Sequence, residues 1–113
     1  MKLRRGEIWL IDLDPSRRGE LGKTRPCVIV SDDRYNALAP APLVMPITSY
    51  PATVRSPAIA ATPATGLLNE SSLLPLHVRA VSRSRFVRRL GRAPAAVIEE
   101  AVEILVLVVT GSR

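Results

Sequence analysis

The stretch GKTRPCVIVS, residues 22–31, contains the clearest fold signal in the chain. Its run CVIVS is apolar and rich in β-branched residues, which predicts a buried strand over residues 27–31. Pro26 suits the first residue of such a strand, where a missing N–H costs little. Arg25 therefore stands at the mouth of an apolar strand, beside a loop that contains glycine, and this position of a guanidinium needs an explanation.

Further strands are expected on both sides of this stretch. EIWLIDL, residues 7–13, alternates between two faces, with Ile8 and Leu10 on one face and Trp9, Ile11 and Leu13 on the other. A third strand is expected over residues 43–47, where the internal Pro46 indicates an edge or a bulge. A weak strand is expected over residues 58–61, and another over residues 72–81 in spite of Pro75.

The C-terminal part has a helical periodicity. Apolar residues recur at three- and four-residue steps from Val97 to Val108, with Glu99 and Glu100 expected near the helix start on the opposite face. Pro94 is suited to open this helix and Gly111 to end it. Because the late run LVLVV is β-branched, a closing strand is the alternative. The order of elements predicts a mostly-β (α+β) fold in one domain spanning residues 1–113.

Composition narrows the classes of function. The chain has 113 residues, a net charge of +6 and a pI of about 10.7, which favours a polyanionic partner such as nucleic acid, although an arginine-rich genome gives the same total. One cysteine excludes an internal disulfide and argues against a cysteine-based zinc site. The basic N-terminus is interrupted by Asp12 and Asp14, and no apolar run reaches the roughly 18–20 residues of a membrane span. We therefore expect a soluble, cytoplasmic protein.

The catalytic inventory is small. The chain has one histidine, no Walker loop, no GxGxxG and no Asp, Glu or His cluster at metal-ligand spacing. The pair Asp32 and Asp33 follows a strand and precedes a turn, which is typical of turn or capping residues. An enzyme acting on nucleic acid with these residues is expected to work without a metal.

The stretches RGEIWLIDLDP, GKTRPCVIVS, LVMPITSYP and GLLNESSLLPLHVRAVSRSRF, in this order, resemble the MazF/PemK family of toxin ribonucleases. The resemblance covers almost the whole chain. It implies an SH3-like small barrel of antiparallel strands with a C-terminal α-helix, similar to the gyrase poison CcdB. It also implies a homodimer that cleaves single-stranded RNA (mRNA) at specific sequences without metal or cofactor and is inhibited by a cognate MazE-like antitoxin, whose C-terminal segment occupies the RNA groove.

The resemblance places the catalytic groups at Arg25, directly before a proline, and at Thr48, which ends the third strand. A guanidinium at the scissile phosphate stabilises the charge that grows when the 2′-oxygen attacks, and the products are a 2′,3′-cyclic phosphate and a 5′-hydroxyl. Thr48 is expected to hold a phosphoryl oxygen or to orient the 2′-hydroxyl. The family also gives its arginine an acid/base role, but arginine is a poor base near neutrality, so we expect Arg25 chiefly to stabilise charge. The alternative is a surface salt bridge with Glu20.

Other predicted RNA contacts surround this pair. The first loop contributes Glu20, Leu21 and Lys23, and the segment after Thr48 contributes Ser49 and Tyr50. An exposed Tyr50 is suited to stack on an unpaired base, and otherwise it covers the core. His77 stands where relatives often carry a glutamine that touches a base; base recognition, acid/base work and a purely structural role all remain open.

Arg79, Arg83 and Arg85 lie at alternating spacing, so on one strand they share a face and form a track for phosphates. Together with Arg88, Arg89 and Arg92 they form, alternatively, a solvated basic face for an acidic antitoxin.

Two other functions fit the same fold. A gyrase-binding poison does not need the pair Arg25 and Thr48, and a noncatalytic nucleic-acid-binding module does not need to bring them together. Residues 50–65 are unusually rich in proline and alanine, and His77 replaces an amide. Because both features lie where substrate choice is set, the RNA target is not predicted.

Overall fold

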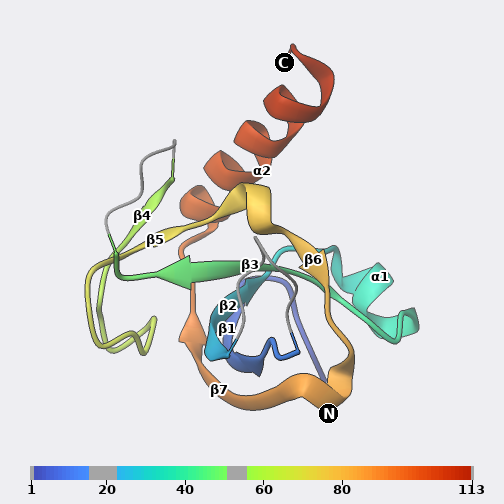
Figure 1. Cartoon of the computed structure of the whole chain (residues 1–113), viewed down its shortest axis with the longest axis vertical. Helices are drawn as coiled ribbons and strands as arrows, with labels where there is room; N and C mark the ends of the chain where they lie inside the picture. Colours follow the sequence, from blue (N-terminus) through green and yellow to red (C-terminus); the bar gives the residue numbers. More distant parts are fainter. Residues whose placement is uncertain (1, 16–22, 51–55, 113) are drawn as a thin grey trace.

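The computed structural model describes residues 2–15, 23–50 and 56–112 (Figure 1). Its strands are β1 (Glu7–Asp12), β2 (Thr24–Ile29), β3 (Leu43–Thr48), β4 (Ala58–Ile59), β5 (Ser71–Leu73), β6 (Arg79–Ala80) and β7 (Phe86–Arg92). Its helices are α1 (Asp33–Leu38), α2 (Ala95–Thr110) and the 3-10 turns η1 (Pro75–His77) and η2 (Arg83–Arg85). The described elements are mostly strands and end with one long helix, which confirms the expected fold class.

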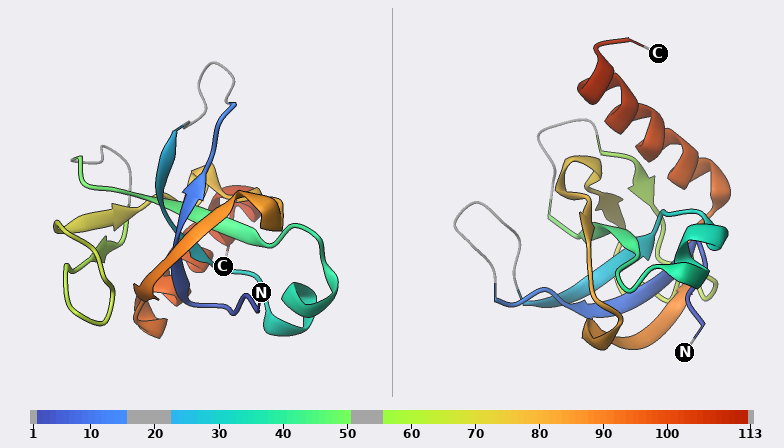
Figure 2. Two further views of the ribbon diagram at one scale, coloured as in Figure 1. Left: turned by 90° about the horizontal axis from the view of Figure 1, so that it is seen from below. Right: turned by 90° about the vertical axis from the view of Figure 1, so that its right-hand side faces the viewer.

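The described strands form one antiparallel sheet in the order β4-β5-β3-β2-β1-β7, with β6 paired to β3 beyond the end of β5. The first three strands follow one another as neighbours, so their hydrogen bonds form between segments that are close in sequence. Strands β4 and β7 are the two ends of this order and do not pair with each other, so the sheet is not closed. The expected barrel is therefore only a loose description of this sheet. In Figures 1 and 2, α1 and the β4–β5 pair lie at opposite ends of the molecule.

Pro46 lies in a central strand that pairs with β2 in a continuous register, which corrects the expected edge or bulge. Its partner across β2 is Cys27, and its carbonyl accepts a hydrogen bond of 2.9 Å from the Leu74 N–H on the other side. The N and C=O of one strand residue face the same side, so the missing N–H of Pro46 faces Leu74. Leu74 lies between β5 and β6, where β3 has no ladder partner, and no ladder bond is lost there.

Each face of the sheet covers its own apolar core. Along β1, Ile8 packs in the core beneath α2, while Ile11 packs in the core on the opposite face, as the alternation predicts. The first core also holds Met45 and Ile47 from β3 and is covered by Ile98 of α2. The second core holds Cys27, Ile29, Val44 and Phe86, with Trp9 packed against Phe86 edge to face at 5.7 Å.

Helix α2 replaces the alternative of a closing strand. It begins after Pro94 and ends at Gly111, whose φ of 73° is the left-handed conformation that glycine adopts without strain. Its first turn contains no acidic residue, because the helix starts at Ala95 and the first glutamate falls in the second turn. Its last turns carry exposed valines, Val108 among them, because α2 extends beyond the sheet (Figure 2).

Three segments differ from the sequence-based expectation. Strand β2 starts at Thr24, so Arg25 and Pro26 lie inside it, because its pairing with β1 extends that far. The single strand expected over residues 72–81 is divided into β5, η1 and β6, since Pro75 opens a 3-10 turn. The weak strand expected over residues 58–61 is confirmed but shorter.

Helix α1 and strand β7 were not expected. Asp32 caps α1 by accepting from the Arg34 N–H, which confirms a capping role for that residue. Strand β7 is mostly exposed, and its arginines and apolar residues do not alternate regularly, so it carries little periodic signal and is defined by its pairing with β1. Within residues 2–15, 23–50 and 56–112, no helix is long and apolar enough to cross a membrane.

Candidate nucleic-acid interface

The register of β2 and β3 brings the two predicted catalytic residues together. Cys27 lies opposite Pro46, and each step along β2 is matched by one step back along β3. Continued by two residues, the same register brings Arg25 opposite Thr48. Since strand side chains alternate between faces, this pair shares a face with Cys27 and Pro46. Neighbouring strands therefore position two residues that lie far apart in the sequence.

Arg25 and Thr48 also line one cavity of about 570 Å³ at this end of the sheet. Two cations, Arg25 and Arg88, are the charged residues of its lining, which includes no carboxylate among the described residues. Apolar walls and hydroxyl or amide groups make up the remainder: Leu10, Thr24, Pro26, Ile47, Thr48, Ser49, Tyr50, Gly66, Leu67, Leu68, Asn69, Ser71 and Leu90. A positive cavity with mixed polar and apolar walls is suited to a nucleotide.

The Thr48 hydroxyl is already oriented by the backbone. Its oxygen accepts a hydrogen bond of 3.2 Å from the Tyr50 N–H, which closes a small turn after β3. A hydroxyl that accepts at its oxygen retains its own proton for donation. This arrangement favours donation by Thr48 to a phosphoryl oxygen over acceptance of a proton from the 2′-hydroxyl.

Cys27 lies directly beneath this face of the sheet and is fully buried. Burial raises the pKa of its thiol from the ordinary 9.0 to about 12, and the positive charges of Arg25 and Arg79 lower the pKa by a smaller amount. The strand register agrees with this: Arg79 lies opposite Val44, whose side chain shares a core with Cys27, so Arg79 is on the face that carries Arg25. The thiol itself stays protonated and inert near neutral pH.

We expect this thiol to make the protein sensitive to alkaline pH. Well below pH 9 the thiol is protonated in the folded and unfolded chain alike, so there it does not affect the pH dependence of stability. Above that pH the unfolded chain ionises while the folded chain, with its pKa of about 12, does not, so the free energy of unfolding falls. Relative to a Cys27→Val variant, the wild type should lose about 2 kcal/mol between pH 7.5 and 10.5. Urea titrations of both proteins at the two pH values measure this difference; parallel losses would contradict it.

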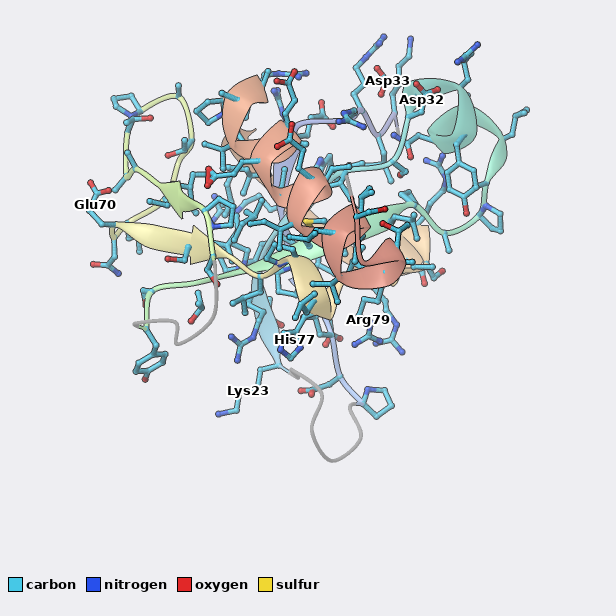
Figure 3. The ribbon with its side chains drawn as sticks, turned by 90° about the horizontal axis from the view of Figure 1, so that it is seen from above. Lys23, Asp32, Asp33, Glu70, His77 and Arg79 are labelled. Atoms are coloured by element: carbon cyan, nitrogen blue, oxygen red, sulfur yellow. The ribbon has the colours of Figure 1, made fainter. Side chains whose placement is uncertain are left out.

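Three further predicted contacts, Lys23, His77 and Arg79, project to one side of the molecule, opposite Asp32 and Asp33 (Figure 3). Lys23 has a φ of 64°, and its backbone closes the β1–β2 pair through a bond of 2.8 Å from the Leu13 N–H to its carbonyl. Its side chain and that of His77 are exposed. His77 ends the turn η1, which packs between β3 and α2.

The prediction that Arg79, Arg83 and Arg85 share one strand face is wrong. Arg79 lies in β6, opposite Val44, whereas the other two lie in the turn η2. The Arg83 guanidinium donates to the carbonyls of Asn36 and Ala39, at the C-terminal end of α1. The Arg85 guanidinium donates to the carbonyls of Asp12 and Asp14. Because backbone carbonyls hold both groups, only Arg79 remains placed for a phosphate near Arg25.

The remaining predicted contacts divide into two groups. Ser49 and Tyr50 line the cavity together with Thr48 and are exposed, so Tyr50 does not cover the core. Glu20 and Leu21 lie outside the described residues. Among residues 2–15, 23–50 and 56–112, no group of three or more His, Cys, Asp or Glu is placed to hold a metal ion.

Several residues that line the cavity were not predicted from the sequence to contact RNA. Arg88 lies opposite Leu10 and faces the cavity, whereas Arg89, opposite Trp9, forms an ion pair of 3.4 Å with the buried Glu7. Adjacent arginines of β7 thus have different roles, which becomes evident only when the register with β1 is known. The stretch GLLN, residues 66–69, also lines the cavity. The two adjacent leucines of this short polar loop were the signal that could have indicated its role. Only one of two neighbouring side chains readily packs inward, so the other is left exposed.

Comparisons with known proteins agree with this geometry. Residues 4–109 match the family model described as PemK-like, MazF-like toxin of type II toxin–antitoxin system. The endoribonuclease MazF9 of Mycobacterium tuberculosis is 37% identical over 93% of this chain and 94% of its own length. The crystal structure of MazF from Deinococcus radiodurans superposes with a TM-score of 0.79 at 26% identity, covering 96% of this chain and 97% of that one. A MazE–MazF structure from the same organism gives 0.74 at 26% identity and covers 99% of both chains.

Proposed function

This chain belongs to the PemK-like, MazF-like toxins of type II toxin–antitoxin systems, and on that basis we propose that it is an endoribonuclease that cuts single-stranded RNA at specific sequences without a metal ion. The observation that carries this proposal is the cavity shared by Arg25 and Thr48. Relatives of the same family are named endoribonucleases, among them PemK of Escherichia coli at 30% identity. A gyrase-binding poison has no need of this pair.

The proposed reaction is an internal transfer at phosphorus. The 2′-oxygen forms a bond to the adjacent phosphorus and loses its proton, the bond from phosphorus to the 5′-oxygen breaks, and that oxygen gains a proton. Negative charge grows on the phosphoryl oxygens. The Arg25 guanidinium donates hydrogen bonds to these oxygens, and the Thr48 hydroxyl donates one more. The products are a 2′,3′-cyclic phosphate and a 5′-hydroxyl.

The proposed partners follow from the charge of the site. A relative from Deinococcus radiodurans is solved as a MazE–MazF complex, and we propose a MazE-like antitoxin for this chain as well. An acidic segment of such a protein would be attracted to a cavity whose charged lining residues are Arg25 and Arg88. We also propose that the protein forms a homodimer and acts in the cytoplasm.

The test is a cleavage assay in EDTA. Purified protein is incubated with a long single-stranded RNA of diverse sequence, and the cut sites and end groups are mapped. We expect discrete cuts at a short motif, with cyclic phosphate on one side and a 5′-hydroxyl on the other, at the same rate with and without EDTA. Binding of the RNA without cuts would favour a noncatalytic module, and cuts that need added metal would overturn the mechanism.

A further inference from the structure

Leu68 is a large apolar side chain that the fold leaves in solvent. It is 94% exposed, although its neighbour Leu67 is buried in the core beneath α2. Leu68 lines the cavity of Arg25 and Thr48, and so does Tyr50, which is 79% exposed. Two exposed apolar side chains at the catalytic cavity are a feature that the reaction at phosphorus does not explain.

The backbone just before Leu68 is held by hydrogen bonds within its own loop and by one to β7. Gly66 donates to the Thr62 carbonyl at 2.9 Å, and the Arg92 N–H donates to the Ala64 carbonyl at 2.8 Å. The buried Thr65 hydroxyl donates to the Ala60 carbonyl at 2.8 Å and accepts from the Leu67 N–H at 3.4 Å. A leucine on a backbone that is already ordered loses little backbone entropy when a ligand covers it, so its position favours binding.

We propose that Leu68 and Tyr50 contact the faces of one nucleobase next to the cleaved phosphate, and that Asn69 recognises the edge of that base. This inference rests on the proposed function and makes this loop a determinant of the RNA motif. None of Leu68, Asn69 and Arg88 was among the RNA contacts expected from the sequence.

The chemistry of the cavity favours a base over other ligands. A nucleobase has apolar faces and a polar edge, and the cavity offers leucine and tyrosine surfaces beside amide and hydroxyl groups. No hydrogen bond within the described part of the chain occupies the Asn69 side-chain amide, which is exposed. Arg25 and Arg88 supply the positive charge that draws a polyanion to this place.

The test compares two leucines of similar exposure. Leu68→Ala removes the proposed base contact, and Leu38→Ala is the matched control, because Leu38 is 89% exposed on α1 and does not line the cavity. For Leu68→Ala we expect kcat/KM for the mapped motif to fall about tenfold, mainly through KM, since the apolar contact binds rather than reacts. Leu38→Ala should retain wild-type values.

A second measurement separates this inference from the proposed function. Binding is followed by fluorescence anisotropy with a single-stranded RNA that is 2′-O-methylated throughout and therefore cannot be cut by this reaction. Leu68→Ala should weaken its binding about tenfold. If wild-type protein binds RNA without cleaving natural RNA, the proposed function fails while the base contact is still measured. If it cleaves and the two leucine variants behave alike, only the base contact is refuted. A changed oligomeric state in Leu68→Ala alone would assign the side chain to a protein interface and overturn the inference.

The role of Asn69 predicts a change of preference rather than of rate alone. Asn69→Asp keeps the shape of the side chain and removes its two amide donors. We expect the base preference to change at one position of the mapped cut sites and to persist at the others. A uniform loss of rate at every site, with the motif unaltered, would contradict a base-reading role.

Discussion

Replacing Arg25 by alanine should lower the rate of RNA cleavage by about 10²–10³-fold, the usual cost of removing one preorganised donor from a developing oxyanion. The fold should survive, because Arg25 is half-buried near the start of β2, before the apolar residues that fill the core. Arg25→Lys keeps the positive charge and loses the planar fork, so it should retain cleavage well above Arg25→Ala. The measurement is the single-turnover cleavage rate of the wild type and of the two Arg25 variants on a short RNA with one mapped site.

The control for this prediction is Arg34→Ala. Arg34 is also an arginine, but its side chain is 95% exposed and pairs at 3.3 Å with Asp32 at the start of α1. Removing it changes the net charge by the same amount and should leave the rate unchanged, since exposed pairs contribute little. An equal loss in Arg25→Lys and Arg25→Ala would contradict simple charge stabilisation and indicate that the geometry of the guanidinium, or its proton, is required.

The parts of the fold that could be predicted are those with a strong local period. Strand β1 and helix α2 alternate at steps of two and of three to four residues, and both were found within one or two residues of their expected bounds. Strand β7 has no such signal, because its apolar residues Phe86, Val87 and Leu90 do not alternate regularly with its arginines, and its existence depends on pairing with β1. The edge or bulge expected at Pro46 was wrong, since a central strand has room for proline where its other neighbour is interrupted.

The candidate site was predictable only in part for a related reason. The pair Arg25 and Thr48 was predicted from the resemblance to the toxin family, and the β2–β3 register explains why the two residues meet. The loop of residues 66–69 was not predicted to line the cavity. Its position depends on contacts with β7, and its own sequence has no pattern that indicates it. Arg83 and Arg85 illustrate the opposite error, since arginine spacing does not reveal which guanidinium groups hold backbone carbonyls.

Gly66→Ala should be the most destabilising single change in this loop. The φ of Gly66 is 71°, and a Cβ there would lie 2.0 Å from the Leu90 carbonyl oxygen, so either Gly66 or β7 must move. Left-handed strain and overpacking together cost about 2–5 kcal/mol, a large part of the stability of a small domain. The free energy of unfolding from urea titrations measures this loss directly. Because residues 66–69 line the cavity with Arg25 and Thr48, cleavage should fall as well.

Two other glycines separate the causes of this effect. Gly111 has nearly the same φ, 73°, but nothing lies within 4 Å of its Cβ position, so Gly111→Ala should cost only about 1–2 kcal/mol. Gly91 has no left-handed φ, yet a Cβ there would lie 2.3 Å from the Ala64 carbonyl oxygen, so Gly91→Ala isolates the close approach between the loop and β7. If contact dominates, Gly91→Ala will resemble Gly66→Ala in stability and cleavage, while Gly111→Ala cleaves normally. A Gly66→Ala protein as stable as Gly111→Ala would instead mean that this loop moves off β7 at little cost, and the rigid placement of Leu68 would fail with it.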